Sequence, residues 1–190
     1  MKYNQDLHHR RSIRLRNYDY STAGAYFVTI CTFERECLFG EVVNGEMRLN
    51  DMGKIVQEEW LRTAEMRKNV VLDEFVVMPN HFHGIIHIHD NVGVHCMHPD
   101  YDEQIDVDRA HVGAPLRRRK SSSIGSIVAG FKSAATKHIN KLRNNPGVPV
   151  WQRNYYERVI RNDRDLQSIQ QYVVDNPATW HEDENHPAHL

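Results

Sequence analysis

Four of the 13 histidines in this chain fall within the stretch MPNHFHGIIHIH, at positions 81, 83, 87 and 89. Alternate residues of a β-strand point to the same face, so a strand here would bring all four imidazoles to one side. Ile85 completes that row, and Gly84 and three apolar residues fill the other side. We therefore asked what chemistry would place so much imidazole on one face of an apolar strand.

His81 and His83 are the first candidates for a metal site. At positions i and i+2 of a strand their Cα atoms would lie roughly 6 to 7 Å apart, from which two imidazoles reach one divalent ion. Imidazole is the commonest side-chain ligand for metals, although histidines on a half-buried strand also occur as ordinary polar residues of a sheet surface. We favour that surface role for His87 and His89, which lie further from the Pro79-Asn80 break where the strand opens.

A second group of polar residues lies on a helix predicted over residues 163–175. An apolar stripe runs along one side of this helix, and Tyr172 flanks the stripe with Asn176 one turn later. A tyrosine at such a boundary is most often a packed ring with a hydrated hydroxyl. Pro177 disfavours helical geometry at the preceding residue, so the helix is expected to end near Asn176.

The other elements must position these groups. Asn44-Gly45 between two short extended runs predicts a hairpin with a primed turn. β-branched and aromatic runs predict strands over 26–32, 70–78 and 81–89 and an extended stretch over 150–160. Spacing by three and four predicts helices from Asn50 or Asp51 to Arg67, over 121–142, and from an Asp163 cap onward. The tail WHEDENHPAHL is expected to be loose, and the element order predicts an α+β sandwich with an antiparallel sheet and helices against one face.

Composition limits the alternatives. A length of 190 residues predicts a single domain over 1–190, with a core from about 18 to 180 and a mobile insertion over about 90 to 120. Three cysteines without a CxxC pair argue against a disulfide framework or a cysteine-based zinc site. The sequence has neither a long apolar run nor a signal-like N-terminus, so a cytoplasmic protein is expected.

The net charge of -1 conceals two basic clusters. One contains Arg10, Arg11, Arg14 and Arg16, and the other contains Arg117, Arg118, Arg119 and Lys120. Such clusters occur as solvated loops, and they also occur where a nucleic-acid-binding protein contacts phosphates. Charge alone leaves both interpretations open.

Four segments together resemble the IS200-like single-tyrosine transposases, and within them the REP-associated tyrosine transposases. VVMPNHFHGIIHI resembles the His-hydrophobic-His signature of the family. The segments that resemble its first strand, middle helix and C-terminal block are AYFVTICTFERECLFGEV, SIGSIVAGFKSAATKHIN and VWQRNYYERVIRNDRDLQSIQQYVVDNP. The resemblance extends from about Tyr18 to Trp180, and the ordered set of segments is far more specific than HFH alone.

The resemblance implies a ferredoxin-like, RNA-recognition-like fold: an antiparallel sheet with helices on one face and a C-terminal helix that carries the nucleophile. It implies that His81 and His83 bind a divalent metal, Mg²⁺ or Mn²⁺, with Asn176 helping to complete the site. Tyr172 matches the nucleophile. The implied activity is nicking and rejoining of single-stranded or hairpin DNA through a 5′-phosphotyrosine intermediate, with the two basic clusters as candidates for contact with the DNA backbone.

Other interpretations remain open. Tyr155 and Tyr156 are rival nucleophiles, although their extended aromatic stretch favours packing roles. The chain could be a non-catalytic or domesticated nucleic-acid-binding module with a metal site, or a metallohydrolase that uses metal-bound water. The target DNA sequence is left open, and so is the choice between a monomer and a homodimer.

Overall fold

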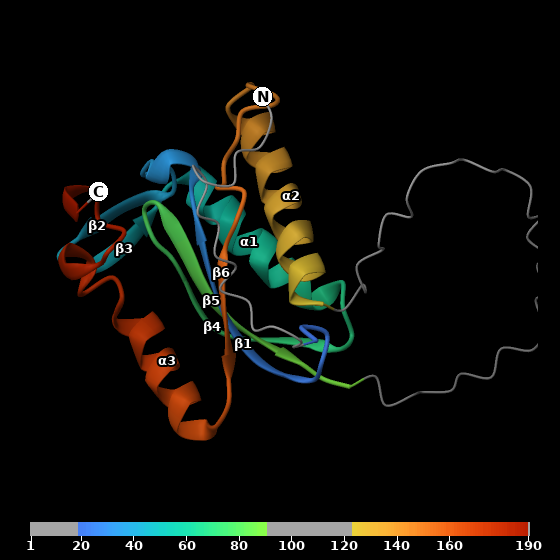
Figure 1. Ribbon diagram of the computed structural model, residues 1–190. Coiled ribbons are helices and arrows are strands. Elements are labelled where there is room, and N and C mark those ends of the chain that lie inside the picture. The colour runs from blue at the N-terminus through green and yellow to red at the C-terminus, as the bar shows by residue number, and fades with distance from the viewer. Residues whose placement is uncertain (1–18, 91–122, 190) are drawn as a thin grey trace, which may run out of the picture.

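A four-stranded antiparallel sheet forms the centre of the computed structural model, which describes residues 19–90 and 123–189. Its strand order is β4-β5-β1-β6, which is the order of a ferredoxin-like fold (Figure 1). The four strands are β1 (Gly24–Cys31), β4 (Val70–Val77), β5 (His81–Ile88) and β6 (Tyr156–Ile160). The two strands predicted on either side of Pro79-Asn80 pair as an antiparallel hairpin. The predicted α+β fold class is confirmed.

Helices α1 (Asp51–Glu65) and α2 (Ile124–Leu142) cover one face of the sheet. This face holds the larger core, in which Phe82 and Phe131 pack against Trp60 with ring centroids 4.5 and 5.1 Å away. Trp60 lies directly over Gly84 of β5, where a Cβ atom would come within 2.6 Å of the indole carbon Cζ2. The absence of a side chain at Gly84 therefore lets α1 pack closely on the sheet.

Helix α3 (Asp163–Asp175) lies across the opposite face, so the sheet is covered on both sides (Figure 1). Its buried residues Ile169 and Val173 pack with Phe27 of β1 and Ile85 of β5 in a second, smaller core. The residues of β5 that face α3 are the histidine row, because their neighbours in sequence point toward α1 and α2. The alternation of the sequence thus separates an apolar face of β5 from a histidine-bearing face.

Local sequence signals account for most element boundaries. The Asn44-Gly45 turn joins β2 (Gly40–Val43) to β3 (Glu46–Leu49), and both turn residues have positive φ, as a primed turn requires. Asn50 caps α1 as one of the two expected residues. The predicted Asp163 cap of α3 is wrong: Asn162 accepts from the backbone N–H of Asp165, which places Asp163 inside the first turn.

The C-terminal segment is ordered, so the expectation of a loose tail is wrong. It contains the short 3₁₀ helices η2 (Trp180–Glu182) and η3 (Pro187–His189), and it buries Asp183 and Asn185. A third 3₁₀ turn, η1 (Phe33–Arg35), follows β1. Over the described ranges, no helix is both long and apolar enough to cross a lipid bilayer. Most of the predicted insertion, residues 91–120, lies outside the described residues.

Candidate active site

His81 and His83 lie at the start of β5, beneath α3, and both are buried. Their ring centroids are 4.5 Å apart, and burial lowers the pKa of both imidazoles, that of His81 to about 4. Both rings are therefore neutral near pH 7, which is the form that binds a metal. The strand geometry predicted from sequence brings these two side chains together.

The buried side chain of Asn80 fixes the orientation of the His81 ring. Its amide nitrogen donates to the carbonyl oxygens of Arg35 and Asn185, at 3.1 and 2.7 Å, so its oxygen must face the imidazole. That oxygen lies 3.0 Å from Nδ1 of His81, which therefore carries the proton. Nε2 is left with a free lone pair and, among the described residues, no hydrogen-bond partner.

Two further polar side chains lie near this lone pair. Asp183 of the C-terminal segment places Oδ2 at 4.0 Å from Nε2 of His81, and Asn176 at the end of α3 lies against the same ring. Asn176 donates from Nδ2 to Oδ2 of Asp183 at 3.1 Å, while its own oxygen, also buried, has no donor within the described part of the chain. The cluster therefore contains an excess of buried acceptors, which is costly unless a cation satisfies them.

His81, His83 and Asp183 can hold a metal ion. One potential ligand atom from each lies within 4.8 Å of the others, and all three residues are buried. Nε2 of His81 and Oδ1 of Asn176 are buried acceptors without a donor among the described residues, and a bound cation would satisfy both. Sequence reasoning missed Asp183, because an acidic residue in a segment without periodicity carries no signal of burial.

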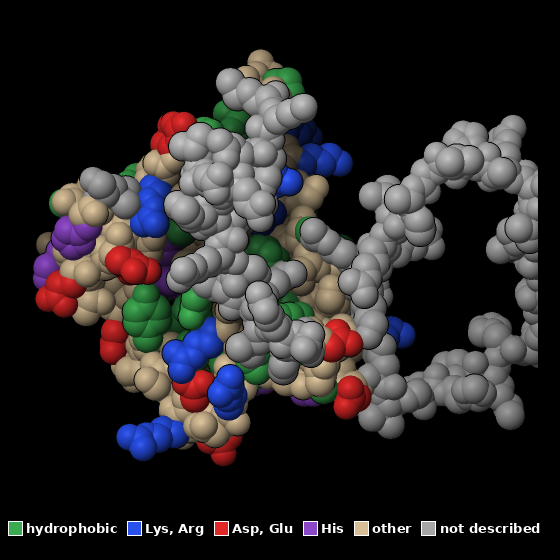
Figure 2. All heavy atoms as spheres, in the orientation of Figure 1, with side chains coloured by type: hydrophobic (Ala, Val, Ile, Leu, Met, Phe, Trp, Pro, Cys, Tyr) green, Lys and Arg blue, Asp and Glu red, His purple; other side chains and the backbone are tan. Residues whose placement is uncertain are grey.

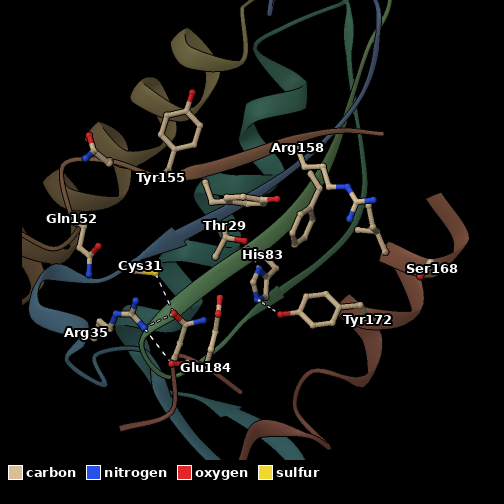
Figure 3. Close-up of a pocket in the computed structure, with 15 residues that line it drawn as sticks. Thr29, Cys31, Arg35, His83, Gln152, Tyr155, Arg158, Ser168, Tyr172 and Glu184 are labelled. Carbon is tan, nitrogen blue, oxygen red and sulfur yellow. Dashed lines mark hydrogen bonds between the residues drawn. The ribbon is translucent and has the colours of Figure 1, made fainter. Parts of the chain in front are cut away.

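Tyr172 meets His83 across the gap between α3 and the sheet. Its hydroxyl lies 3.3 Å from Nε2 of His83, and Nδ1 of the same ring lies 2.9 Å from the Thr29 hydroxyl (Figure 3). The ring packs edge-on against Phe27 with centroids 6.1 Å apart. Burial, together with the negative charges of Asp183 and Glu184, raises the pKa of Tyr172 to about 12. The side chain is nonetheless 45% exposed and accessible to a large substrate.

The Tyr172–Asn176 spacing survives the following proline. Asn176 keeps helical dihedral angles, φ -54° and ψ -41°, although the helix ends at Asp175. The two side chains therefore lie on the same side of α3, one turn apart. The structure thus brings together the four residues singled out from the sequence: His81, His83, Tyr172 and Asn176.

A cavity of about 600 Å³ opens beside Tyr172, between α3 and strands β1, β5 and β6. Its walls include His83, Tyr172, Arg35, Gln152 and Arg158 (Figure 3). Figure 2 shows hydrophobic side chains exposed on this face beside α3, with basic and acidic side chains around them. The rival tyrosines 155 and 156 also line the cavity, but only Tyr172 has a hydrogen-bonding contact with His83.

The other two histidines of the row lie apart from this cluster. His87 pairs with Asp73 at 2.8 Å, and His89 is exposed at the end of β5. The two basic clusters proposed for DNA contact, Arg10 to Arg16 and Arg117 to Lys120, lie outside the described residues.

We compared the chain with family models, with curated protein sequences and with solved structures. No family model matches it. An uncharacterized protein of Haemophilus influenzae (strain KW20 / Rd) is 42% identical over 183 residues, covering 96% of each chain. The solved structure of a REP-associated tyrosine transposase bound to a REP hairpin superposes with a TM-score of 0.54 at 19% identity, covering 89% of this chain and 74% of that one. A Deinococcus radiodurans structure, at 15% identity, covers 86% of this chain and 97% of its own, but its TM-score of 0.44 is too low to bear on the fold.

The sequence similarity shows family membership, and the structural similarity shows the fold. Identity of 42% across nearly the whole of both chains establishes common family membership. The superposition with a TM-score of 0.54 establishes a shared fold and confirms the structural side of the resemblance drawn from the sequence motifs, and at 19% identity it shows the fold alone. The chain therefore belongs to the same family as the Haemophilus influenzae protein, and it has the fold of a REP-associated tyrosine transposase.

Proposed function

We propose that this protein nicks and rejoins single-stranded or hairpin DNA in a metal-dependent reaction through a 5′-phosphotyrosine intermediate. The observation that carries this proposal is the 3.3 Å approach of the Tyr172 hydroxyl to Nε2 of His83, at the edge of the buried His81–His83–Asp183 cluster. A protein of the same fold has been seen bound to a REP hairpin, which supports a hairpin DNA as the substrate.

Tyr172 supplies the nucleophile. Its Oη forms a bond to the phosphorus of a phosphodiester, the bond from phosphorus to the 3′ oxygen breaks, and the released 3′ oxygen takes up a proton in place of the one lost by the phenol. The energy of the phosphoester is retained in the protein–DNA bond, so a 3′ hydroxyl can reverse the reaction and rejoin the strand. With a pKa of about 12 the phenol is protonated at neutral pH, so its proton must leave as attack occurs.

The metal ligands in this proposal are His81, His83 and Asn176, to which the structure adds Asp183. A bound Mg²⁺ or Mn²⁺ would neutralise charge that develops on the phosphate oxygens. The mixture of imidazole nitrogens with carboxylate and amide oxygens favours Mn²⁺ by ligand preference and also admits Mg²⁺. Asn80 does not bind the metal in this proposal, but its side-chain oxygen accepts from Nδ1 of His81 and so fixes the tautomer of that ring.

Contact with the rest of the DNA is assigned to the two basic clusters, by composition alone. Arg10, Arg11, Arg14 and Arg16 form one, and Arg117, Arg118, Arg119 and Lys120 form the other. Segments of this composition suit the backbone of a single strand, for which cationic grooves and aromatic stacking surfaces are the usual combination.

A covalent-adduct assay tests the proposal. End-labelled hairpin oligonucleotides are incubated with the protein and Mn²⁺ or Mg²⁺, and the products are separated on a denaturing gel. The wild-type protein should give a protein-linked band that protease digestion removes. Tyr172→Phe keeps the ring and should abolish both the nick and the adduct, whereas Tyr155→Phe and Tyr156→Phe should still form the adduct.

The outcomes separate the competing functions. Nicking by Tyr172→Phe without an adduct would replace the tyrosine mechanism with a hydrolytic one that uses water. Tight hairpin binding with neither nick nor adduct, in every metal and on every oligonucleotide, would identify a non-catalytic nucleic-acid-binding module.

A further inference from the structure

The turn that follows β1 is held in an unfavourable backbone conformation. Glu34 and Arg35 are successive non-glycine residues in the left-handed region, with φ of 53° and 56°. This region is disfavoured for residues with a side chain, and conformations of this kind persist only where surrounding contacts impose them. Contacts with other segments must therefore hold this turn, and the turn fixes the position of the Arg35 side chain.

Buried polar contacts hold the turn. The Thr32 hydroxyl lies 2.8 Å from the carbonyl oxygen of Glu36 and 2.9 Å from that of Asn80, and Thr32 itself has no exposed surface. Asn80 donates from its side chain to the carbonyl oxygen of Arg35 at 3.1 Å. The same amide orients His81, so one buried residue couples the position of Arg35 to the metal-binding cluster.

The Arg35 side chain projects into the cavity that contains Tyr172 and His83 (Figure 3). Its Nη1 donates to neutral acceptors, the Asn185 side-chain oxygen at 2.8 Å and the Glu184 carbonyl oxygen at 3.4 Å. Within residues 19–90 and 123–189, no carboxylate lies within 4.0 Å of its guanidinium nitrogens. Nε and Nη2 have no hydrogen-bond partner in the same ranges.

The second arginine of the cavity differs in this respect. Arg158 pairs with Asp165 at 2.6 Å, which neutralises its charge. The guanidinium of Arg35 has no such ion-pair partner among the described residues, and its side chain lines the cavity. The cavity thus holds both the candidate nucleophile and, within the described ranges, a guanidinium that has free donors and no ion-pair partner.

We propose that Arg35 binds a non-bridging oxygen of the phosphate that Tyr172 attacks, and this proposal rests on the proposed function. A guanidinium presents paired donors that match phosphate geometry, and it gains most where charge develops in a partly dry site. The strained turn gives the arginine a fixed position, which lowers the entropy lost on binding. The Nη1 contacts with the C-terminal segment leave the other donors available for the phosphate.

Arg35→Gln tests this proposal against Arg164→Gln, a matched loss of one positive charge at an exposed position of α3 that does not line the cavity. Binding of a labelled single-stranded hairpin is measured in the Tyr172→Phe background over a series of salt concentrations, which makes the binding result independent of cleavage. Arg35→Gln should weaken binding about tenfold and reduce the slope of log affinity against log salt by about 0.7, the value for one phosphate contact on a single strand. Arg164→Gln should change neither.

Arg35→Lys supplies the second measurement, with Tyr172 intact. Lysine keeps the charge and the strained backbone but loses the paired donors, so the salt slope should persist while the rate of adduct formation falls about tenfold. If Arg35→Gln fails to fold, as judged by thermal unfolding, this variant decides: a wild-type adduct rate would overturn the proposal.

The results distinguish this proposal from the proposed function. If the wild-type protein forms the adduct and Arg35→Gln binds with unchanged affinity and salt slope, the arginine merely tethers the C-terminal segment and the present inference is wrong. If no adduct forms but Arg35→Gln weakens binding and flattens the slope, the tyrosine mechanism fails while Arg35 remains a phosphate-binding residue.

Discussion

The two ends of the histidine row on β5 contrast in how their polar atoms are satisfied. At one end His81 is fully buried, and its Nε2 faces the carboxylate of Asp183 at 4.0 Å without a hydrogen-bond donor among the described residues. At the other end His87 is 27% exposed and bonds Asp73 at 2.8 Å. Asp73 in turn accepts two bonds from Gln170 of α3, at 2.9 and 3.0 Å.

The same residue type on the same strand face thus serves two purposes. The hydrogen bonds of the Asp73 carboxylate connect β4, β5 and α3. They occupy both of its oxygens, so neither is left to coordinate a metal ion. The cluster around His81 keeps unpaired acceptors where water is excluded, which is unfavourable for stability and suited to a cation. The partners contributed by distant segments decide the role of each histidine. Four predictions test this contrast.

The largest expected effect is on metal binding. His81→Ala or His83→Ala should lower Mn²⁺ affinity by more than about 100-fold, because each removes a proposed direct ligand. His87→Ala, the same change on the same face, should leave affinity unchanged. Calorimetric titration of the three variants with Mn²⁺ measures the difference. Equal losses in all of them would mean that the metal site extends along the whole row.

The pH dependence of stability should differ between the two ends. In the unfolded chain His81 titrates near 6.5, and burial lowers its pKa in the folded protein to about 4. Below pH 6.5 the unfolded state therefore binds more protons, and His81 alone should lower the free energy of unfolding by about 3 kcal/mol between pH 6.5 and 4. Burial raises the pKa of Asp73, but hydrogen bonds from His87 and Gln170 lower it overall, so its contribution is lost only below its ordinary value of 3.8.

Urea unfolding of metal-free protein at a series of pH values checks this expectation. The loss of stability between pH 6.5 and 4 should shrink in His81→Gln and persist in Asp73→Asn. A wild-type profile in His81→Gln would show that the imidazole is not the group responsible.

The third effect concerns the carboxylate that the sequence did not reveal. Asp183→Asn preserves the shape of the side chain and removes its charge, so Mn²⁺ affinity should fall roughly 10- to 100-fold. Asp73→Asn removes a charge at the other end and should leave Mn²⁺ affinity intact. An Asp183→Asn protein that binds Mn²⁺ like the wild type would leave the two histidines and Asn176 as the ligands.

The smallest effect is structural. Gln170→Ala removes both bonds to Asp73 and should lower the free energy of unfolding by about 1 kcal/mol without altering Mn²⁺ affinity. Gln171→Ala, its neighbour, loses only an exposed bond to Asp175 and should cost a few tenths of a kcal/mol. Loss of Mn²⁺ affinity in Gln170→Ala would show that the two ends of the row are coupled through α3.

Local patterns predicted the parts of the fold that depend on neighbours in sequence. Alternation along β5, the Asn44-Gly45 turn and the periodicity of residues 124–142 each follow from a few adjacent residues. The approach of Tyr172 to His83 joins residues 89 positions apart, and no local pattern encodes it. The family resemblance, rather than periodicity, singled out this tyrosine.

The missed features depend on contacts at long range. Asp183 and Asn185 are buried because the C-terminal segment packs against the start of β5, where the Asn80 side chain bonds the Asn185 carbonyl across 105 positions. The segment has a polar, aperiodic sequence that resembles a loose tail when it is considered alone. The role of Asn80 was equally hidden, since an asparagine after proline ordinarily indicates only a turn.

The close packing of Trp60 on Gly84 makes the His81–His83–Asp183 cluster sensitive to the opposite side of the sheet. Gly84 follows His83 directly, and a single added carbon would meet the indole at 2.6 Å. Substitutions there would displace the strand backbone and tilt the imidazole beside it. Paired changes at Gly84 and Trp60 therefore offer a way to tune reactivity in directed evolution while every residue proposed to contact DNA or metal stays the same.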